Sequence, residues 1–141
     1  MMTFKERYNA AHYEYYKVKY PSVVADGLYC APTLPKYKTA NGLTKFITNY
    51  ILWAGWRATR VNTMGRQVGG KWIPGTTRKG TSDISATIKG RSVMIEIKVG
   101  KDKASEYQLK EQELERKSGG IFEFISSPEE FFTLYDYVLS L

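Results

Sequence analysis

The chain has 141 residues, 43% of them hydrophobic, which is enough for one compact domain with a buried core. No apolar run approaches the roughly 18 residues that span a bilayer, and the first residues lack the apolar segment of a signal peptide. The single cysteine, Cys30, excludes an intramolecular disulfide, which agrees with a reducing compartment. We therefore expect a cytoplasmic protein without a membrane partner.

The net charge of +7 is concentrated in the middle of the chain. Residues 1–56 carry 7 basic and 3 acidic side chains, residues 57–103 carry 11 and 3, and residues 104–141 carry 3 and 8. A basic zone of this kind attracts polyanions, of which nucleic acid is the commonest in cytoplasm. The alternative is a basic surface without a specific partner.

The first 40 residues are expected to form an N-terminal helix and an extended arm. Thr3 and Glu6 have the spacing of a capping box, which predicts a helix from about residue 4 to residue 19, ended by Pro21. The helix is rich in tyrosine interleaved with lysine. These rings are suited to stack on bases or to pair with a second subunit, but packing onto the domain is favoured. Residues 22–40 show no clean period and are expected to be irregular.

A second helix is predicted from about residue 43 to residue 54, with Asn41 as its N-cap and apolar residues at helical spacing. A strand over residues 56–62 and a glycine-rich basic segment over residues 64–80 follow, with a short hairpin at Gly69-Gly70. Such segments let cations approach phosphates closely. The basic residues expected to contact nucleic acid are Arg57, Arg60, Arg66, Lys71, Arg78, Lys79, Lys101 and Lys103.

Residues 83–98 are predicted to form a β-hairpin with Lys89-Gly90 as its two-residue turn. That turn fixes the register and places Asp83 directly opposite Glu96, in a pair of the non-hydrogen-bonded kind, whose side chains approach most closely. Alternation along the strands puts the aliphatic residues on one face and Asp83, Glu96 and Lys98 on the other. Opposed carboxylates are destabilising, so they indicate a shared cation. The alternative is an exposed face with scattered charges.

Beyond the hairpin, Ser105 and Gln108 form a second capping box that opens a helix to about residue 118. A short strand over residues 121–125 and a helix capped at Ser127-Pro128 complete the chain. Because a strand, a helix and a strand follow the hairpin, we expect an α/β fold with a mixed β-sheet flanked by helices.

Asp83 and Glu96 supply the hard oxygen ligands that Mg²⁺ or Mn²⁺ prefers, and the carbonyl of Ile97 is a candidate third ligand. Such a metal activates water and neutralises the charge that builds on a phosphate during hydrolysis. Lys98 lies on the same strand face as Glu96, within reach of that phosphate or of the attacking water.

The sequence resembles the PD-(D/E)XK nuclease superfamily and, more narrowly, its VRR-NUC branch. The resemblance rests on four segments within residues 41–132, namely 80–84 (GTSDI), 95–98 (IEIK), 104–108 (ASEYQ) and the glycine pair at 119–120 before a strand. It implies a restriction-endonuclease-like core over residues 41–141. It also implies phosphodiester hydrolysis with Asp83 and Glu96 as metal ligands, Lys98 as the catalytic lysine and Gln108 lining the site. Stand-alone members of this size look like structure-selective DNA nucleases, including four-way-junction resolvases that act as dimers.

One departure from the family concerns a third metal ligand. Many relatives carry a glutamate on the helix before the first strand, but this chain has no acidic residue between Asp26 and Asp83. Asn41 or Thr44 lies near the expected place. A carboxylate from Glu6, from Glu14 or from a partner subunit is the other source to consider.

The leading hypothesis is a Mg²⁺-dependent endonuclease that acts on branched or duplex DNA, with a homodimer left open. The second hypothesis is a nucleic-acid-binding module that keeps the nuclease fold but has weak chemistry or none. A third reading is a subunit of a larger DNA-processing complex, with the tyrosine-rich N-terminal helix as its docking element.

Overall fold

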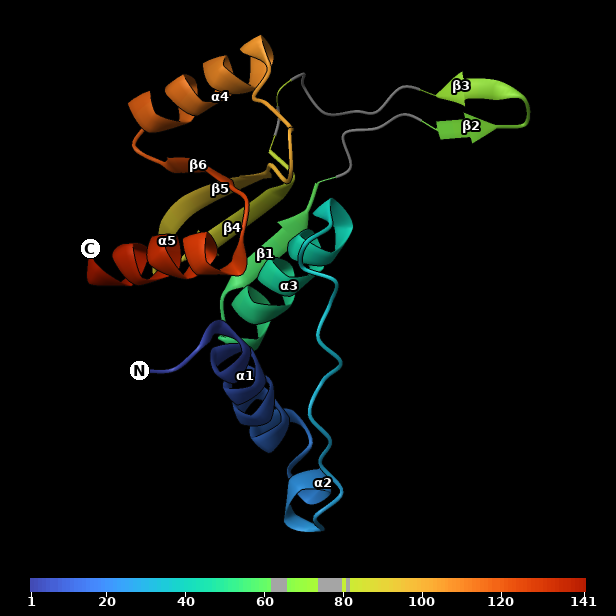
Figure 1. The fold of residues 1–141 in the computed structure, drawn as a ribbon, viewed down its shortest axis with the longest axis vertical. Helices are drawn as coiled ribbons and strands as arrows, with labels where there is room; N and C mark the ends of the chain where they lie inside the picture. Colours follow the sequence, from blue (N-terminus) through green and yellow to red (C-terminus); the bar gives the residue numbers. More distant parts are fainter. Residues whose placement is uncertain (62–65, 74–79, 81) are drawn as a thin grey trace.

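The computed structural model describes residues 1–61, 66–73, 80 and 82–141 (Figure 1). Within these residues the elements, in chain order, are α1 (Phe4–Lys19), α2 (Pro21–Ala25), α3 (Ala40–Trp53), β1 (Arg57–Arg60), β2 (Arg66–Val68), β3 (Lys71–Ile73), β4 (Ile84–Ile88), β5 (Arg91–Ile97), α4 (Glu106–Lys117), β6 (Ile121–Ile125) and α5 (Pro128–Ser140).

The main sheet has four strands in the order β1-β4-β5-β6. The β1–β4 and β4–β5 pairs are antiparallel, whereas β5 and β6 are parallel because α4 connects them as a crossover. Strands β2 and β3 form a separate two-stranded sheet around the predicted turn at Gly69-Gly70. The α/β class and the mixed sheet flanked by helices are therefore confirmed.

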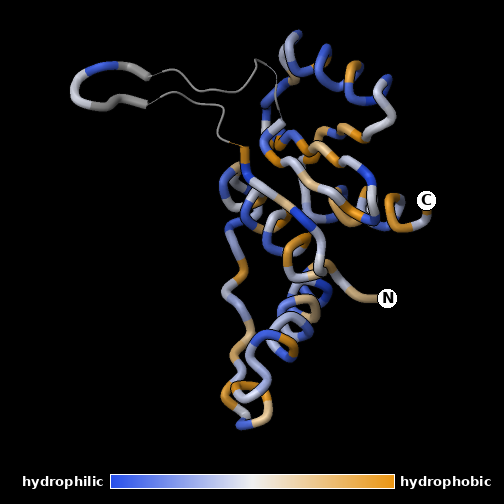
Figure 2. Tube along the Cα trace, turned by 180° about the vertical axis from the view of Figure 1, so that it is seen from behind, coloured by the Kyte–Doolittle hydropathy of each residue, from blue (hydrophilic) through white to orange (hydrophobic). Residues whose placement is uncertain are grey.

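The helices divide between the two faces of the sheet. Helices α3 and α5 cover the apolar face, which Ile84, Val93 and Ile95 form. Helix α4 packs along β6 on the other face. Figure 2 shows hydrophobic residues gathered in the sheet strands, α3 and α5, while α4 is mainly hydrophilic. Within the described residues, α3 packs on β1 and β4 from the apolar side, and no helix packs extensively on their polar face beside α4.

Helix α1 is part of the same hydrophobic core. Tyr8 is only 1% exposed and stacks on Phe46 of α3, with ring centroids 4.4 Å apart. The capping box predicted at its start is present, since Thr3 and Glu6 exchange hydrogen bonds. Tyr8 therefore packs onto the domain, which is the role that the sequence analysis favoured for the tyrosines of this helix.

The hairpin at the centre of the sheet has the predicted turn and register. Lys89 and Gly90 both have positive φ, 52° and 79°, which is the requirement of a type I′ two-residue turn. Ile88 pairs with Arg91, and the register continues to Ile84 opposite Ile95. The local turn chemistry therefore sets which side chains meet at the far end of the hairpin.

Three predicted boundaries were wrong. Helix α3 begins at Ala40, because Thr39 rather than Asn41 accepts the capping hydrogen bond, from the backbone N–H of Gly42 at 3.1 Å. The segment expected to be irregular contains most of α2, where Pro21 begins a short helix as well as ending α1. Strand β1 covers residues 57–60 of the predicted 56–62, of which residue 62 lies outside the described residues. Within the described residues, no helix is both long and apolar enough to cross a membrane.

Arg7 ties α1 to α5. Its guanidinium donates two hydrogen bonds to the carboxylate of Asp136, at 2.9 and 2.7 Å, and lies 4.1 Å from the ring centroid of Phe132. The hydrogen bond from Arg7 lowers the pKa of the Asp136 carboxyl below its ordinary value. The pair therefore stabilises the folded state only while Asp136 is ionised.

We expect the Asp136→Asn variant to lose at most about 1 kcal/mol of unfolding free energy, since the Asp136 side chain is more than half exposed. Because its pKa is lowered on folding, the wild-type advantage is full above the unfolded-state pKa and disappears as pH falls through the folded-state pKa. Urea unfolding at a series of pH values from 7 to below 4 measures the difference. Asp26→Asn, at the C-cap of α2, is the control, and a wild-type advantage that persists at the lowest pH contradicts the assignment.

Candidate active site

Asp83 and Glu96 meet at the open end of the β4–β5 hairpin. Asp83 directly precedes β4, and Glu96 lies next to Ile95, which pairs with Ile84. The backbone N–H of Asp83 donates to Oε2 of Glu96 at 3.1 Å, and the backbone N–H of Ile97 donates to Oδ2 of Asp83 at 2.8 Å. Each carboxylate thus accepts a hydrogen bond from the opposite strand, which confirms the predicted juxtaposition.

Glu96 is the centre of this arrangement and is only 5% exposed. Its Oε1 accepts a hydrogen bond of 2.8 Å from Nε2 of Gln108. The ammonium Nζ of Lys98 lies 3.7 Å from the same oxygen. The predicted catalytic residues Asp83, Glu96, Lys98 and Gln108 are therefore brought together in one contiguous cluster.

The cluster raises the pKa of Glu96 to about 7. Burial is the first cause, because it penalises the charged form, and the nearby Asp83 carboxylate is the second. Lys98 acts in the opposite direction and offsets only part of the rise. A buried carboxylate beside the half-buried Asp83 thus creates an excess of negative potential at this point.

The side-chain amide of Gln108 makes two hydrogen bonds, one within the start of α4 and one to Glu96. Its Oε1 accepts from the backbone N–H of Ser105 at 2.9 Å, which completes the capping box predicted at the start of α4. Its Nε2 is the group that donates to Glu96. The cap therefore fixes the rotamer that reaches the carboxylate.

Gly80 lies against the first turn of α4. It has a φ of +83°, and a Cβ at this position would overlap the backbone of Tyr107 and approach the amide N of Gln108 to 2.9 Å. This close approach holds the segment before Asp83 against the helix that carries Gln108. Only glycine satisfies both the left-handed conformation and the contact.

The residues considered for a third metal ligand are engaged elsewhere. Oδ1 of Asn41 accepts from Arg60 at 2.6 Å, and the hydroxyl of buried Thr44 donates to the carbonyl of Ala40 at 2.8 Å. In α1, Glu6 belongs to the capping box and Glu14 pairs with Lys17. Within the described residues, no group of three or more His, Cys, Asp or Glu side chains is placed to hold a metal.

The donor set nonetheless suits a hard divalent cation. Asp83 and Glu96 provide two carboxylates on adjacent strands. A positive ion there would offset the repulsion from Asp83 that, after burial, contributes to the raised pKa of Glu96. Mg²⁺ and Mn²⁺ are commonly held by one or two carboxylates together with waters and substrate oxygens. The residues therefore fit the predicted metal, with the carbonyl of Ile97 as a further oxygen in the same segment.

The two predicted basic residues of β1 lie on opposite faces of the sheet. Arg57 pairs in register with Thr87 and lies 3.5 Å from Oγ of Ser85, so it shares the polar face with the site. Arg60 pairs with Ile84, whose side chain faces the core, and donates to Asn41 at the start of α3. Arg57 therefore lies on the site's face of the sheet and Arg60 does not.

Two of the remaining predicted basic residues, Arg66 and Lys71, belong to the separate β2–β3 sheet. Lys71 is exposed at the end of the β2–β3 turn, and Lys101 and Lys103 are exposed in the segment that joins β5 to α4. The side chain of Arg66, and residues Arg78 and Lys79, lie outside the described part of the structure. Two lysines thus follow Lys98 closely along the chain at the site's end of the sheet.

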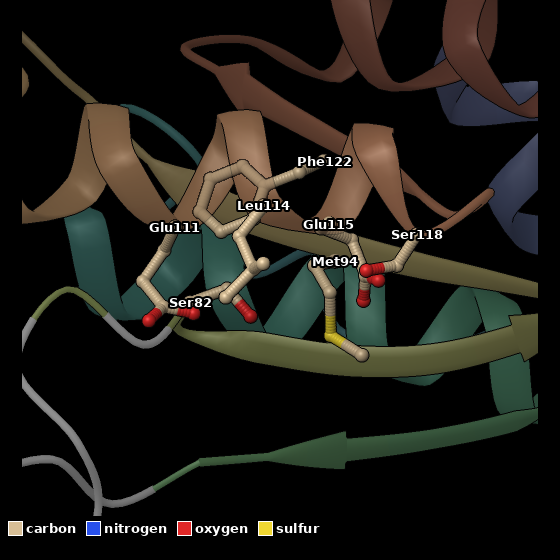
Figure 3. A pocket seen from close by; sticks show the side chains of 7 residues that line it. All are labelled: Ser82, Met94, Glu111, Leu114, Glu115, Ser118 and Phe122. Carbon is tan, nitrogen blue, oxygen red and sulfur yellow. The ribbon is translucent and has the colours of Figure 1, made fainter.

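A cavity of about 360 Å³ adjoins the site on the same face of the sheet. Figure 3 shows that α4 and the strands line it, with Glu111 beside Ser82 at one end and Glu115 beside Ser118 at the other. Sequence reasoning missed these glutamates. The available signal was their helical spacing from Gln108, which puts all three on one face of α4.

No family model, curated protein or solved structure matches this chain. The functional assignment therefore depends on the geometry of the site and on the motif resemblance.

We expect Gly80→Ala to destabilise the protein more than Gly119→Ala. Both glycines have positive φ, +83° and +92°, so alanine is strained by about 1–2 kcal/mol at either position. Only at position 80 does the new Cβ meet backbone atoms, since nothing lies within 4 Å of it at position 119. Thermal unfolding measures the difference, and equal melting temperatures for the two variants contradict the close approach of Gly80 to α4.

Proposed function

We propose that the chain is a metal-dependent DNA endonuclease of the PD-(D/E)XK type, related to the VRR-NUC branch, with residues 41–141 as its nuclease-like core. The observation that carries this proposal is the contact of Glu96 with Asp83, Lys98 and Gln108 at one end of a β-hairpin. Two adjacent carboxylates with a lysine beside one of them are suited to hydrolysis of a phosphodiester. Branched or duplex DNA is the proposed substrate.

The residues of the site divide the work in this proposal. Asp83 and Glu96 would hold the Mg²⁺ or Mn²⁺ ion, which would activate water and neutralise charge on the phosphate when bound. Lys98 provides a fixed positive charge 3.7 Å from Glu96, suited to stabilise the negative charge that develops on the phosphate. Gln108 orients the Glu96 carboxylate through a hydrogen bond made rigid by the helix cap.

The substrate is proposed to approach along the open polar face of β1 and β4. Arg57, Thr59 and Ser85 lie on this face, which leads to Asp83. Lys101 and Lys103 extend the positive charge beyond Lys98. Contacts from such residues go to phosphates and favour recognition of backbone shape over base sequence.

We expect purified protein with Mg²⁺ to cleave branched DNA, and EDTA to abolish the cleavage. Asp83→Asn, Glu96→Gln and Lys98→Gln are each expected to slow cleavage by about a hundredfold or more. The first two remove a charge that would hold the metal, and the third removes the positive charge proposed to act on the phosphate. Gel assays on a four-way junction and on linear duplex measure the rates and the preference.

Two charge-matched variants serve as controls for this experiment. Glu123→Gln removes an exposed carboxylate that pairs with Arg116, and Lys110→Gln removes an exposed ammonium on α4. Both are expected to cleave at the wild-type rate. Undiminished cleavage by the Asp83 or Glu96 variant contradicts the site assignment.

Gln108→Glu tests the metal site without an activity assay. Glutamate preserves the capping box but places a third carboxylate beside Glu96. We expect its melting temperature in EDTA to fall by about 3–5 °C, and Mg²⁺ to raise it more than in the wild type. Gln108→Ala, which adds no charge, is the control. A Mg²⁺ shift that is the same in all three proteins argues against a cation between these carboxylates.

A nucleic-acid-binding module without catalysis is the second candidate function. The observation that favours it is the absence of a three-ligand acidic group among the described residues. This candidate predicts salt-sensitive DNA binding with no cleavage in Mg²⁺ or Mn²⁺. Binding that is unchanged in Asp83→Asn and Glu96→Gln, with no cleavage by the wild type, establishes it over the nuclease.

A further inference from the structure

The C-terminal end of α1 carries tyrosines that the core does not use. Tyr13 is 39% exposed and Tyr20, the C-cap residue, is 41% exposed, whereas Tyr8 at the other end of the helix is buried. Exposed aromatic rings on a helix that is otherwise anchored indicate a contact surface. We call Tyr13, Tyr15, Lys17, Lys19 and Tyr20 the tyrosine–lysine cluster.

Each lysine of the cluster lies over an aromatic ring. Lys17 Nζ lies 5.3 Å from the ring centroid of Tyr13. Lys19 Nζ lies 5.3 Å from the ring of Tyr15 and 5.7 Å from that of Tyr20, and donates a 2.8 Å hydrogen bond to the Tyr15 hydroxyl. The rings and ammonium groups therefore form two groups at the end of α1, Lys17 with Tyr13 and Lys19 with Tyr15 and Tyr20. Glu14, paired with Lys17 at 3.2 Å, is the acidic group beside the first of them.

Buried and half-buried aromatic side chains pack beneath the tyrosine–lysine cluster. His12 is buried, accepts or donates a 2.7 Å hydrogen bond with the Tyr29 hydroxyl, and contacts the rings of Tyr16 and Trp53. Tyr13 and Tyr29 meet edge to face with centroids 5.1 Å apart. The exposed rings are thus held on a fixed scaffold, which reduces the entropy lost when a ligand binds.

We infer that the tyrosine–lysine cluster binds single-stranded nucleic acid. Unpaired bases have free faces that stack on tyrosine rings, and the phosphates between them pair with ammonium groups. Duplex DNA offers phosphates but not free base faces, so the exposed rings favour a single strand. This inference concerns a surface separate from the candidate active site, since Figure 1 places α1 beyond the end of the sheet that lies opposite Asp83 and Glu96.

A second copy of this chain is a poorer occupant of the cluster. A symmetric contact through this surface brings Lys17 and Lys19 of both copies together, and the charges repel. The first 38 residues carry six lysines and arginines but only Glu6, Glu14 and Asp26 as acidic residues. Charge complementarity therefore points to a polyanion.

The test is fluorescence anisotropy with a labelled 20-nucleotide single strand of thymidine, in EDTA so that no cleavage occurs. We expect Tyr13→Ala combined with Tyr20→Ala to weaken binding by about tenfold or more, because two stacking rings are lost. Lys17→Gln combined with Lys19→Gln is expected to reduce the slope of log K against log salt by about 1.4, or roughly 0.7 for each phosphate contact. The lysine variant keeps the rings and so guards against a folding defect in the tyrosine variant.

Matched controls come from outside the cluster. Tyr137→Ala removes a tyrosine that is 55% exposed on α5, and Lys5→Gln removes a lysine from the first turn of α1. Both are expected to bind as the wild type does. A strand containing 2-aminopurine is expected to change fluorescence with the wild type and not with the tyrosine variant, which identifies stacking.

Two results overturn the inference. The first is single-strand binding by the tyrosine variant that equals that of Tyr137→Ala. The second is a wild-type dimer in sedimentation that the Lys17 and Lys19 changes leave intact but the Tyr13 and Tyr20 changes dissociate, since the cluster then contacts a second copy.

Discussion

The pairing of β4 with β5 is the interaction on which the site depends. A two-residue turn at Lys89-Gly90 sets the register, and that register alone brings Asp83 against Glu96. The two strands then stabilise the contact by reciprocal hydrogen bonds from backbone N–H groups to carboxylates. A shift of one residue would turn Glu96 to the core face and separate the pair, because side chains alternate between the faces of a strand.

Placing like charges together in a buried position has an electrostatic cost, seen in the raised pKa of Glu96. The surrounding structure offsets part of it through Lys98 and through the amide of Gln108. Gly80 allows the chain before Asp83 to lie against the start of α4, so the helix cap and the hairpin end are fixed relative to each other. Such preorganisation is what a hydrolytic site requires, since donors must be in place before charge develops on the substrate.

The site and the N-terminal extension play different roles in the proposed activity. The site supplies two carboxylates and one lysine, and its metal is proposed to complete its coordination with water and substrate oxygens. The extension joins the core through Tyr8 and through the Arg7–Asp136 pair, while its far end presents rings and ammonium groups. A nuclease that recognises DNA structure has to distinguish paired from unpaired segments, and the tyrosine–lysine cluster is a surface suited to the unpaired ones.

The sequence by itself determined the features that depend on near neighbours. The turn, the hairpin register and the capping boxes at Thr3 and Ser105 follow from residues within a few positions of one another, and all are present. The tertiary structure decided what depends on distant residues. Arg60 is directed to Asn41 by the register of β1 with β4, and the cavity with Glu111 and Glu115 exists because α4 lies across β5 and β6. These outcomes could not be read from spacing, because each is set by packing between elements that are far apart along the chain.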